Sequence, residues 1–195
     1  MLKAMKDLNL PKDFVDPRKV LAEAGVKKGW TGADFGCGSG YFTIALAEKV
    51  LAGGGAKGGE DGKVYALDVL PSSLESVKGA AKIKELTNII LKKANIEILG
   101  GSGLKDGSLD VVVVKDVLFQ NREKENIIKE AARVLKGKGM LIVVEWDSWK
   151  NFSIGPAADI RVKKEDVLEM AKDDFDFLRE LNAGGYHYGL LFKRK

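Results

Sequence analysis

The sequence predicts an α/β fold in which a doubly wound, mostly parallel sheet carries helices on both faces and ends in an antiparallel hairpin. Short runs rich in β-branched residues alternate with longer stretches of helical periodicity, as strand–helix–strand units require. The run from Val111 to Val114 is apolar without alternation, which is typical of a central strand covered on both faces. After Trp146 the alternation stops, and the end of the chain has the pattern of a hairpin.

Seven strands are expected in all. Five of them follow the alternating pattern, and two form the terminal hairpin joined at residues 183–185; they are placed at residues 31–35, 63–68, 89–93, 109–115, 140–146, 175–182 and 186–194. These elements use the whole chain. We therefore expect one domain over residues 1–195, with a sheet-and-helix core over 29–195 and an N-terminal helical segment over 1–28 that acts as a lid.

The helices between the strands have recognisable ends. They are expected at residues 41–51, from 72 to about 86, at 121–135 and at 163–172. Ser72, followed three residues later by Glu75, fits a capping box for the second helix. Asn121 suits the N-cap of the third helix, and Gly137 stands where a glycine would end it.

Composition excludes several classes of protein. The 195 residues carry 32 basic and 28 acidic side chains, a net charge of +4, and the charges are interspersed, which is too weak a bias to indicate nucleic acid on its own. A single cysteine, Cys37, excludes an internal disulfide and a multi-thiolate zinc site. A single histidine, His187, excludes a paired-imidazole metal site, so no metal is expected. Apolar runs are far too short to span a bilayer, and the first ten residues lack the apolar stretch of a signal peptide, so we expect a cytoplasmic protein with no membrane partner.

The glycine-rich stretch at residues 53–59 has two interpretations. A phosphate-binding loop is one, but no Lys-Ser/Thr pair follows it and the next element is a strand rather than a helix. We therefore interpret this stretch as an expanded surface connection between the first helix and the second strand.

A second glycine motif has a clearer chemical meaning. Gly36, Gly38 and Gly40 lie between the first strand and the first helix, where glycines allow a tight turn and a close approach of backbone to ligand. The start of the helix offers free N–H groups to an anionic group, either a pyrophosphate or the carboxylate of an amino-acid ligand. In the nicotinamide fingerprint the third glycine stands one residue later, at the position that Tyr41 occupies here, which disfavours the pyrophosphate.

Asp68 ends the second strand, at the edge of the sheet where ligands of open α/β folds bind. A carboxylate at this point can accept two hydrogen bonds from a ribose diol. A lone acid after a strand is also common for purely structural reasons, but the adjacent glycine motif favours the ribose interpretation.

The two motifs together resemble those of a known family. The segment from Asp34 to Gly40 resembles motif I of the class I S-adenosylmethionine-dependent methyltransferases, and residues 62–68 resemble their second motif. Residues 108–113 are similar to the family's fourth strand, and residues 130–139 to the helix and turn before the fifth. The general pattern is most similar to small methyltransferase-domain proteins of the ubiquinone/menaquinone-biosynthesis type. The resemblance implies a Rossmann-like seven-stranded sheet and S-adenosylmethionine as the cofactor.

The resemblance also implies roles for individual residues. Asp34 would hold the methionine ammonium, Asp68 the ribose hydroxyls, and Lys115 would lie beside the reacting end of the cofactor. Asn95 stands where the family usually has an acid that accepts from the adenine amino group, so this hydrogen bond would lack charge assistance. The complete set expected around the cofactor is Asp34, Gly36, Cys37, Gly38, Gly40, Asp68, Val69, Asn95, Ile96 and Lys115.

The methyl acceptor is less well defined by the sequence. Asp116 and His187 are candidates for orienting it or taking its proton, although a strand-end cap and a structural histidine are the alternatives. Aromatic residues in the segment 146–152 would either wall an acceptor pocket or pack a loop over the core. The Asn/Asp-Pro-Pro-aromatic motif, with which family members hold an exocyclic amino group, is missing after the fourth strand. Cys37, lying in the cofactor loop, is interpreted as a small loop residue rather than a nucleophile.

Four functions are compatible with these observations. The leading hypothesis is methyl transfer to a small molecule, because nothing resembles an appended recognition domain. An RNA methyltransferase, a cofactor-binding protein without transferase activity and a nicotinamide-dependent oxidoreductase are the alternatives. The oligomeric state is left open.

Overall fold

The computed structural model describes residues 13–51, 62–149 and 154–195. Its centre is one seven-stranded sheet in the order β3-β2-β1-β4-β5-β7-β6. The strands are β1 (Gly32–Phe35), β2 (Val64–Asp68), β3 (Ile89–Lys93), β4 (Leu109–Lys115), β5 (Leu135–Trp146), β6 (Phe175–Leu181) and β7 (His187–Arg194). The first five strands are parallel, and β7 runs antiparallel between β5 and β6. This order confirms the predicted fold class, the terminal hairpin included.

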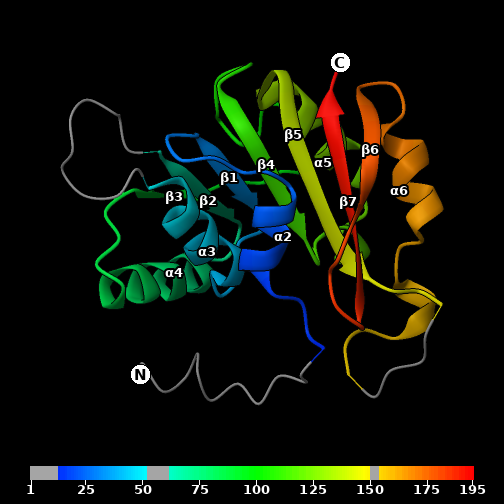
Figure 1. The fold of residues 1–195 in the computed structure, drawn as a ribbon, viewed down its shortest axis with the longest axis horizontal. Coiled ribbons are helices and arrows are strands. Elements are labelled where there is room, and N and C mark those ends of the chain that lie inside the picture. The colour runs from blue at the N-terminus through cyan, green and yellow to red at the C-terminus, as the bar shows by residue number, and fades with distance from the viewer. Residues whose placement is uncertain (1–12, 52–61, 150–153) are drawn as a thin grey trace.

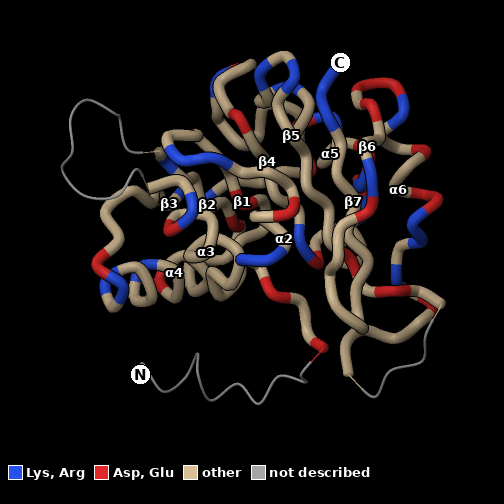
Figure 2. Tube along the Cα trace, viewed as in Figure 1, with Lys and Arg blue, Asp and Glu red and all other residues tan. Residues whose placement is uncertain are grey.

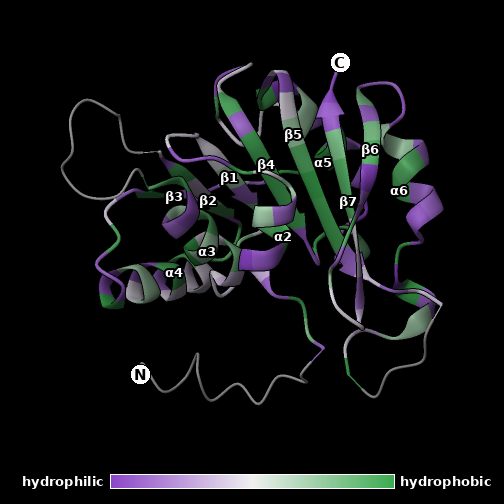
Figure 3. Ribbon diagram, viewed as in Figure 1, coloured by the Kyte–Doolittle hydropathy of each residue, from purple (hydrophilic) through white to green (hydrophobic). Residues whose placement is uncertain are grey.

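Helices cover both faces of this sheet (Figure 1). They are α2 (Pro17–Glu23), α3 (Tyr41–Val50), α4 (Pro71–Ile83), α5 (Lys124–Val134) and α6 (Lys164–Ala171), with short 3-10 turns η1 (Leu118–Gln120) and η2 (Ala158–Ile160). Val111 and Val113 pack with α2 and α3 on one face, while Val112 and Val114 pack with α5 and α6 on the other. The middle of this central strand, Val111–Val114, is therefore apolar at every position, and Figure 3 shows hydrophobic colour over most of β4.

Three details of the predicted helix ends are wrong. The helix α4 begins at Pro71 after Leu70, with no side-chain cap, so Ser72 and Glu75 form no capping box. The helix α5 begins at Lys124 rather than beside Asn121, whose amide instead donates to the Val117 carbonyl. Gly137 does not end α5, because β5 starts directly after this helix at Leu135 and includes the glycine.

The start of α5 is capped from elsewhere in the chain. The carboxylate of Glu97, in the loop after β3, accepts hydrogen bonds from the backbone N–H groups of Arg122 and Glu123 at 2.9 and 3.2 Å. These are N–H groups that a helix cannot satisfy within itself. Because Glu97 lies 25 residues before Arg122, no local pattern around Asn121 indicates this cap.

A buried ion pair fixes the same loop at a second point. Glu130 of α5 is fully buried and accepts from the backbone N–H groups of Gly100 and Ser102 at 2.8 and 3.1 Å. Arg133, one turn further along, donates to both of its carboxylate oxygens at 2.8 and 2.7 Å. Burial opposes ionisation of Glu130, but these hydrogen bonds outweigh it and lower its pKa to about 2.

Charged residues are interspersed along the helices and loops rather than gathered over one element (Figure 2). Within the three described segments, no helix is long and apolar enough to cross a membrane. The same segments contain no group of three or more His, Cys, Asp or Glu side chains placed to hold a metal ion. The glycine-rich stretch at 53–59 and residues 1–12 of the expected N-terminal lid lie outside the described residues.

We predict that Glu130→Ala lowers the free energy of unfolding by about 3 kcal/mol, since it leaves Arg133 and two backbone N–H groups without their acceptor. Urea unfolding followed by circular dichroism measures this loss. Glu125→Ala on the same helix is the matched control, because Glu125 forms only an exposed ion pair with Lys129 at 3.8 Å and should change stability by less than about 0.5 kcal/mol. Equal effects of the two variants would show that the buried pair is not a main source of stability.

Candidate functional site

The glycine loop after β1 is bound to the end of β2. The N–H groups of Gly36 and Cys37 both donate to the Leu67 carbonyl, at 2.8 and 2.9 Å. The N–H of Gly38 donates to the Asp68 carboxylate at 2.9 Å, and the other oxygen of that carboxylate accepts from Leu70 N–H at 2.9 Å. Each carboxylate oxygen keeps a free lone pair, so Asp68 can build the loop and still accept from a ligand.

Each glycine of the motif meets a different requirement. All three have positive φ, 72° at Gly36, 50° at Gly38 and 89° at Gly40. A Cβ at Gly36 would lie 2.6 Å from Val117, and one at Gly40 would lie 3.1 Å from Val77, so these two glycines permit close packing. A Cβ at Gly38 meets nothing within 4 Å. The structure therefore leaves open space at Gly38 alone among the three.

Asp34 lies beneath this loop at the end of β1. It is buried, and its carboxylate accepts a hydrogen bond of 2.6 Å from the Thr43 hydroxyl at the start of α3. Burial raises the pKa of Asp34 to about 6, although the Thr43 hydrogen bond and the charge of Lys115 act in the opposite direction. A buried carboxylate with so few partners suits a cationic ligand group, because a positive charge would favour its ionised form.

A cavity of about 230 Å³ opens beside this loop, at the sheet edge toward which the β5 arrow points in Figure 1. The chain brings together six of the predicted site residues around it: Asp34, Gly36, Cys37, Gly38, Lys115 and Asp116. Four further lining residues were not predicted as site residues: Ser39, Tyr41, Phe42 and Gln120. Tyr41 and Phe42 follow the glycine motif directly, so proximity in sequence was the available signal for them.

The other predicted residues do not line this cavity: Gly40, Asp68, Val69, Asn95, Ile96 and His187. Gly40 caps α3, and Val69 is half exposed after β2. Asn95 is exposed, and its side-chain oxygen accepts from Glu97 N–H at 2.9 Å, which leaves one lone pair for another donor. The side chain of Ile96 is buried in the core, so only its backbone is suited to contact a ligand.

Cys37 is a buried thiol in the loop. Burial, with the negative charges of Asp34 and Asp68, raises its pKa far above the usual range. A thiol that stays protonated is a poor nucleophile, which is consistent with its interpretation as a small loop residue.

Opposite the loop, the end of β4 meets the start of β7. Asp116 follows β4 with a positive φ of 56°, and its carboxylate lies 3.3 and 3.4 Å from Nε2 of His187. The ammonium group of Lys115 contacts the same carboxylate. Asp116 and His187 are 71 positions apart in the sequence. Their contact brings together the two residues that the sequence analysis named as candidates for orienting the acceptor.

Aromatic rings surround this cluster. The centroid of the Phe14 ring lies 5.1 Å from that of His187 and 6.0 Å from that of Trp146. It lies 5.6 Å from Nζ of Lys115. The segment that carries Phe14 is held by the Tyr41 hydroxyl, which donates to the Val15 carbonyl at 2.8 Å, and by Gly185 N–H, which donates to the Asp13 carbonyl at 2.7 Å. The Trp146 ring is tilted by 37° against the His187 ring, with 4.3 Å between the centroids, whereas Trp149 is 76% exposed. Of the aromatic residues predicted in the segment 146–152, Trp146 therefore packs against the cluster, and residues 150–152 lie outside the described residues.

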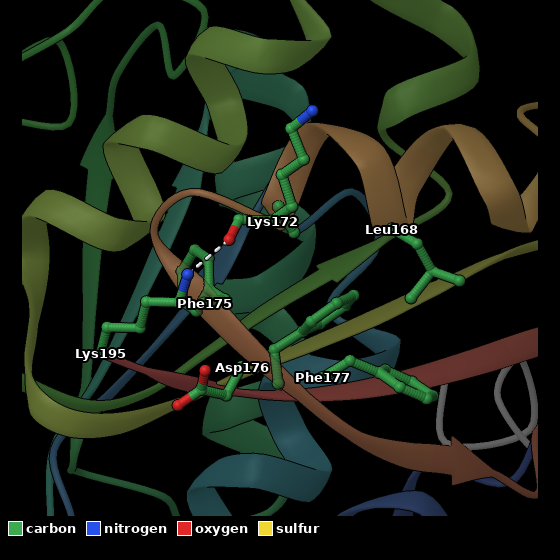
Figure 4. Close-up of a pocket in the computed structure, with 8 residues that line it drawn as sticks. Leu168, Lys172, Phe175, Asp176, Phe177 and Lys195 are labelled. Atoms are coloured by element: carbon green, nitrogen blue, oxygen red, sulfur yellow. Dashed lines mark hydrogen bonds between the residues drawn. The ribbon is translucent and has the colours of Figure 1, made fainter.

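A larger cavity of about 330 Å³ lies at the opposite edge of the sheet (Figure 4). It is lined by residues such as Leu168, Lys172, Phe175, Phe177 and Lys195. Lys195 donates a hydrogen bond to the Lys172 carbonyl across its rim, and Phe175 and Phe177 belong to the edge strand β6. None of the site residues predicted from the sequence lines this larger cavity.

Comparison with known proteins agrees with this geometry. Residues 27–185 match the family model described as a methyltransferase domain. The chain belongs to the class I S-adenosylmethionine-dependent methyltransferases. The family and its solved structures identify S-adenosylmethionine as the cofactor of this domain.

Individual relatives show how far the similarity reaches. A demethylmenaquinone methyltransferase from Lactococcus lactis is 34% identical over 131 residues, covering 65% of this chain and 46% of that protein. A demethylmenaquinone methyltransferase from Geobacillus stearothermophilus is 31% identical over 128 residues, covering 66% of this chain and 50% of that protein. The chain thus spans about half the length of these curated relatives. The crystal structure of a SAM-dependent methyltransferase from Aquifex aeolicus superposes with a TM-score of 0.82 at 25% identity, covering 99% of this chain and 98% of the other.

The surroundings of Gly36 and Gly38 predict which of the two alanine variants is the less stable. Gly36→Ala should unfold at clearly lower urea concentration than the wild type, because its Cβ would clash with Val117 in addition to the cost of positive φ. Gly38→Ala should lose only about 1–2 kcal/mol, the cost of a left-handed conformation for a residue with a Cβ. Urea titrations of both variants measure the difference. If Gly38→Ala proved the less stable variant, the close contact between the glycine loop and Val117 would be in doubt.

Proposed function

We propose that this protein transfers the methyl group of S-adenosylmethionine to a small-molecule acceptor bound between the glycine loop and the Lys115–Asp116–His187 cluster. The observation that carries the proposal is the cavity that Asp34 and Gly38 line together with Lys115 and Asp116. The curated relatives are named for demethylmenaquinone, which is itself a small molecule.

The residues fit the cofactor at three points. The open space at Gly38 admits a ligand against the backbone, and the buried carboxylate of Asp34 matches an ammonium group. The Asp68 carboxylate, with one lone pair free on each oxygen, matches a ribose diol at the end of the adjacent strand. We assign Val69, the side-chain oxygen of Asn95 and the backbone N–H of Ile96 to the adenine side, since β2 and β3 end next to one another there.

Bound S-adenosylmethionine supplies an electrophilic methyl group on a sulfonium, so the protein's task is to position the acceptor and exclude water. Asp116 faces the cavity and is the group that we assign to orienting the acceptor or receiving its proton. His187, whose side chain is fully buried, acts behind Asp116 through the contact at Nε2. The rings of Phe14 and Trp146 pack around this pair and exclude water from it.

The proposal is tested with labelled cofactor. The protein is incubated with S-adenosylmethionine carrying a tritiated methyl group and, in separate reactions, with a panel of hydroxylated aromatic and quinol acceptors or with bulk RNA. We expect label in a small molecule, and we expect Asp116→Ala to reduce the rate at least tenfold. Label only in RNA would overturn the small-molecule acceptor. Tight cofactor binding without transfer to any acceptor would overturn the transferase activity itself.

The raised pKa of Asp34 leads to a prediction about pH. Ionised Asp34 should bind the cofactor ammonium, and protonation near pH 6 should remove this attraction, so affinity should fall as the pH is lowered through 6. We expect the Kd for S-adenosylmethionine to rise about tenfold between pH 7 and pH 5, as a single proton with a pKa of about 6 requires. Isothermal titration calorimetry measures this change.

Asp34→Asn is the matched control for this prediction. The amide has nearly the same shape and keeps an oxygen for the Thr43 hydroxyl, but it does not titrate. Its affinity should be weaker at pH 7 and independent of pH between 7 and 5. A wild-type affinity that does not change over this range would remove Asp34 from the ammonium site.

A further inference from the structure

One fully buried acid lies next to the proposed site without a role in it. Glu145 is the penultimate residue of β5, and its side chain has no exposed surface. Its neighbours along the strand, Val143, Val144 and Trp146, are all buried apolar residues. A carboxyl group in such surroundings is costly unless hydrogen bonds compensate for its lost hydration. Glu145 lines neither of the two cavities.

The contacts of Glu145 are to the turn that follows Asp116. One oxygen, Oε1, accepts from the N–H groups of Val117 and Leu118, at 2.8 and 2.6 Å. These groups begin the short turn η1 and have no acceptor within it. The bonds connect the end of β5 to the loop after β4 and so hold the residues on either side of Val117 in a fixed geometry.

This turn contains a strained residue at the point that matters for the site. Asp116 has a positive φ of 56°, a conformation that residues with a Cβ adopt rarely and keep only when their surroundings impose it. Its own N–H donates to the Val144 carbonyl at 2.9 Å, and its carbonyl accepts from the Gln120 side chain at 2.6 Å. Glu145 supplies the next two anchors along the chain, immediately after the strained residue.

Three buried polar atoms without hydrogen bonds gather here among the described residues: Oδ1 of Asp116, Oε2 of Glu145 and Nδ1 of His187. Burial, followed by the negative charge of Asp116, raises the pKa of Glu145 to about 8. The Lys115 ammonium contacts the carboxylate of Asp116, directly after β4. The other titratable groups near Glu145 are Lys115 and Tyr188, which pairs with Glu145 across the β5–β7 ladder.

We propose that Glu145 is a positioning residue for Asp116: its buried carboxyl group holds the turn at residues 116–118 so that the Asp116 side chain faces both the cavity and His187. The proposal rests on the proposed function only in the role given to Asp116. The geometry it describes can be measured without an acceptor.

The single histidine of the chain makes a direct test possible. In untagged protein labelled with ¹⁵N-histidine, the ring resonances belong to His187 alone and report its contact with Asp116. Asp116→Ala defines the change caused by loss of that contact. Glu145→Leu, which fills the space but accepts no hydrogen bond, should shift the Nε2 resonance in the same direction although Asp116 is still present. Glu145→Gln keeps an acceptor oxygen and should leave the resonance near its wild-type position.

Amide hydrogen exchange supplies a second readout. In Glu145→Leu the amides of Val117 and Leu118 should exchange about tenfold faster than in the wild type, the change that corresponds to one lost hydrogen bond. Glu145→Gln should retain most of their protection. Glu130→Gln is the matched control, since Glu130 is also fully buried and also accepts two backbone N–H groups, but in the loop after β3. It should change neither these two amides nor the His187 resonance.

The outcomes separate this proposal from the proposed function. If Glu145→Leu folds and leaves both the His187 resonance and the two amides unchanged, the positioning role is wrong. If Glu145→Leu does not fold, Glu145→Met, which is close to glutamate in length and accepts no backbone hydrogen bond, replaces it and is judged by the same two signals: a shift toward Asp116→Ala supports the role, and wild-type signals overturn it. Failure to find a methyl acceptor would affect only the proposed function, because no readout here depends on turnover.

Discussion

The hydrogen bond from the Gly38 N–H to the Asp68 carboxylate is the contact on which the ligand-binding edge of this protein depends. It joins the loop after β1 to the end of β2, together with the two bonds that Gly36 and Cys37 donate to the Leu67 carbonyl. The loop therefore has a fixed shape before any ligand is bound, and its positive φ angles are compatible with glycine at each turn. A loop that is already ordered loses little conformational entropy on binding, which favours affinity.

The other half of the site depends on long-range pairing. Parallel pairing of β4 with β5 and antiparallel pairing of β5 with β7 bring Asp116, Glu145 and His187 to the same sheet edge. Val117 connects this group to the cofactor loop, because it packs against Gly36 so closely that no side chain fits at that glycine. The backbone that would hold the cofactor and the turn that carries Asp116 therefore contact one another directly, which couples their geometry.

The sequence predicted the features that depend on local pattern or on strong motifs. The seven strands and their alternation with helices along the chain follow from periodicity. The pairing of the glycine motif with Asp68 follows from the family resemblance. It did not predict the cap on α5, because the acceptor is Glu97 from a distant loop rather than the neighbouring Asn121. It also gave no role to Glu130 or Glu145. An acid within an apolar strand, as at Glu145, was the one available signal, and its partners are visible only once β4 and β5 are paired.

The central claim is that the glycine loop and the Lys115–Asp116–His187 cluster face one ligand across a single cavity. A crystal structure of the protein with S-adenosylhomocysteine, the demethylated cofactor, tests it most directly. The account predicts the amino-acid end of this ligand against Asp34 and Gly38, its ribose on Asp68, and its sulfur directed toward Asp116. Electron density for the ligand elsewhere, for example between Phe175 and Lys195 at the opposite edge of the sheet, would contradict the account.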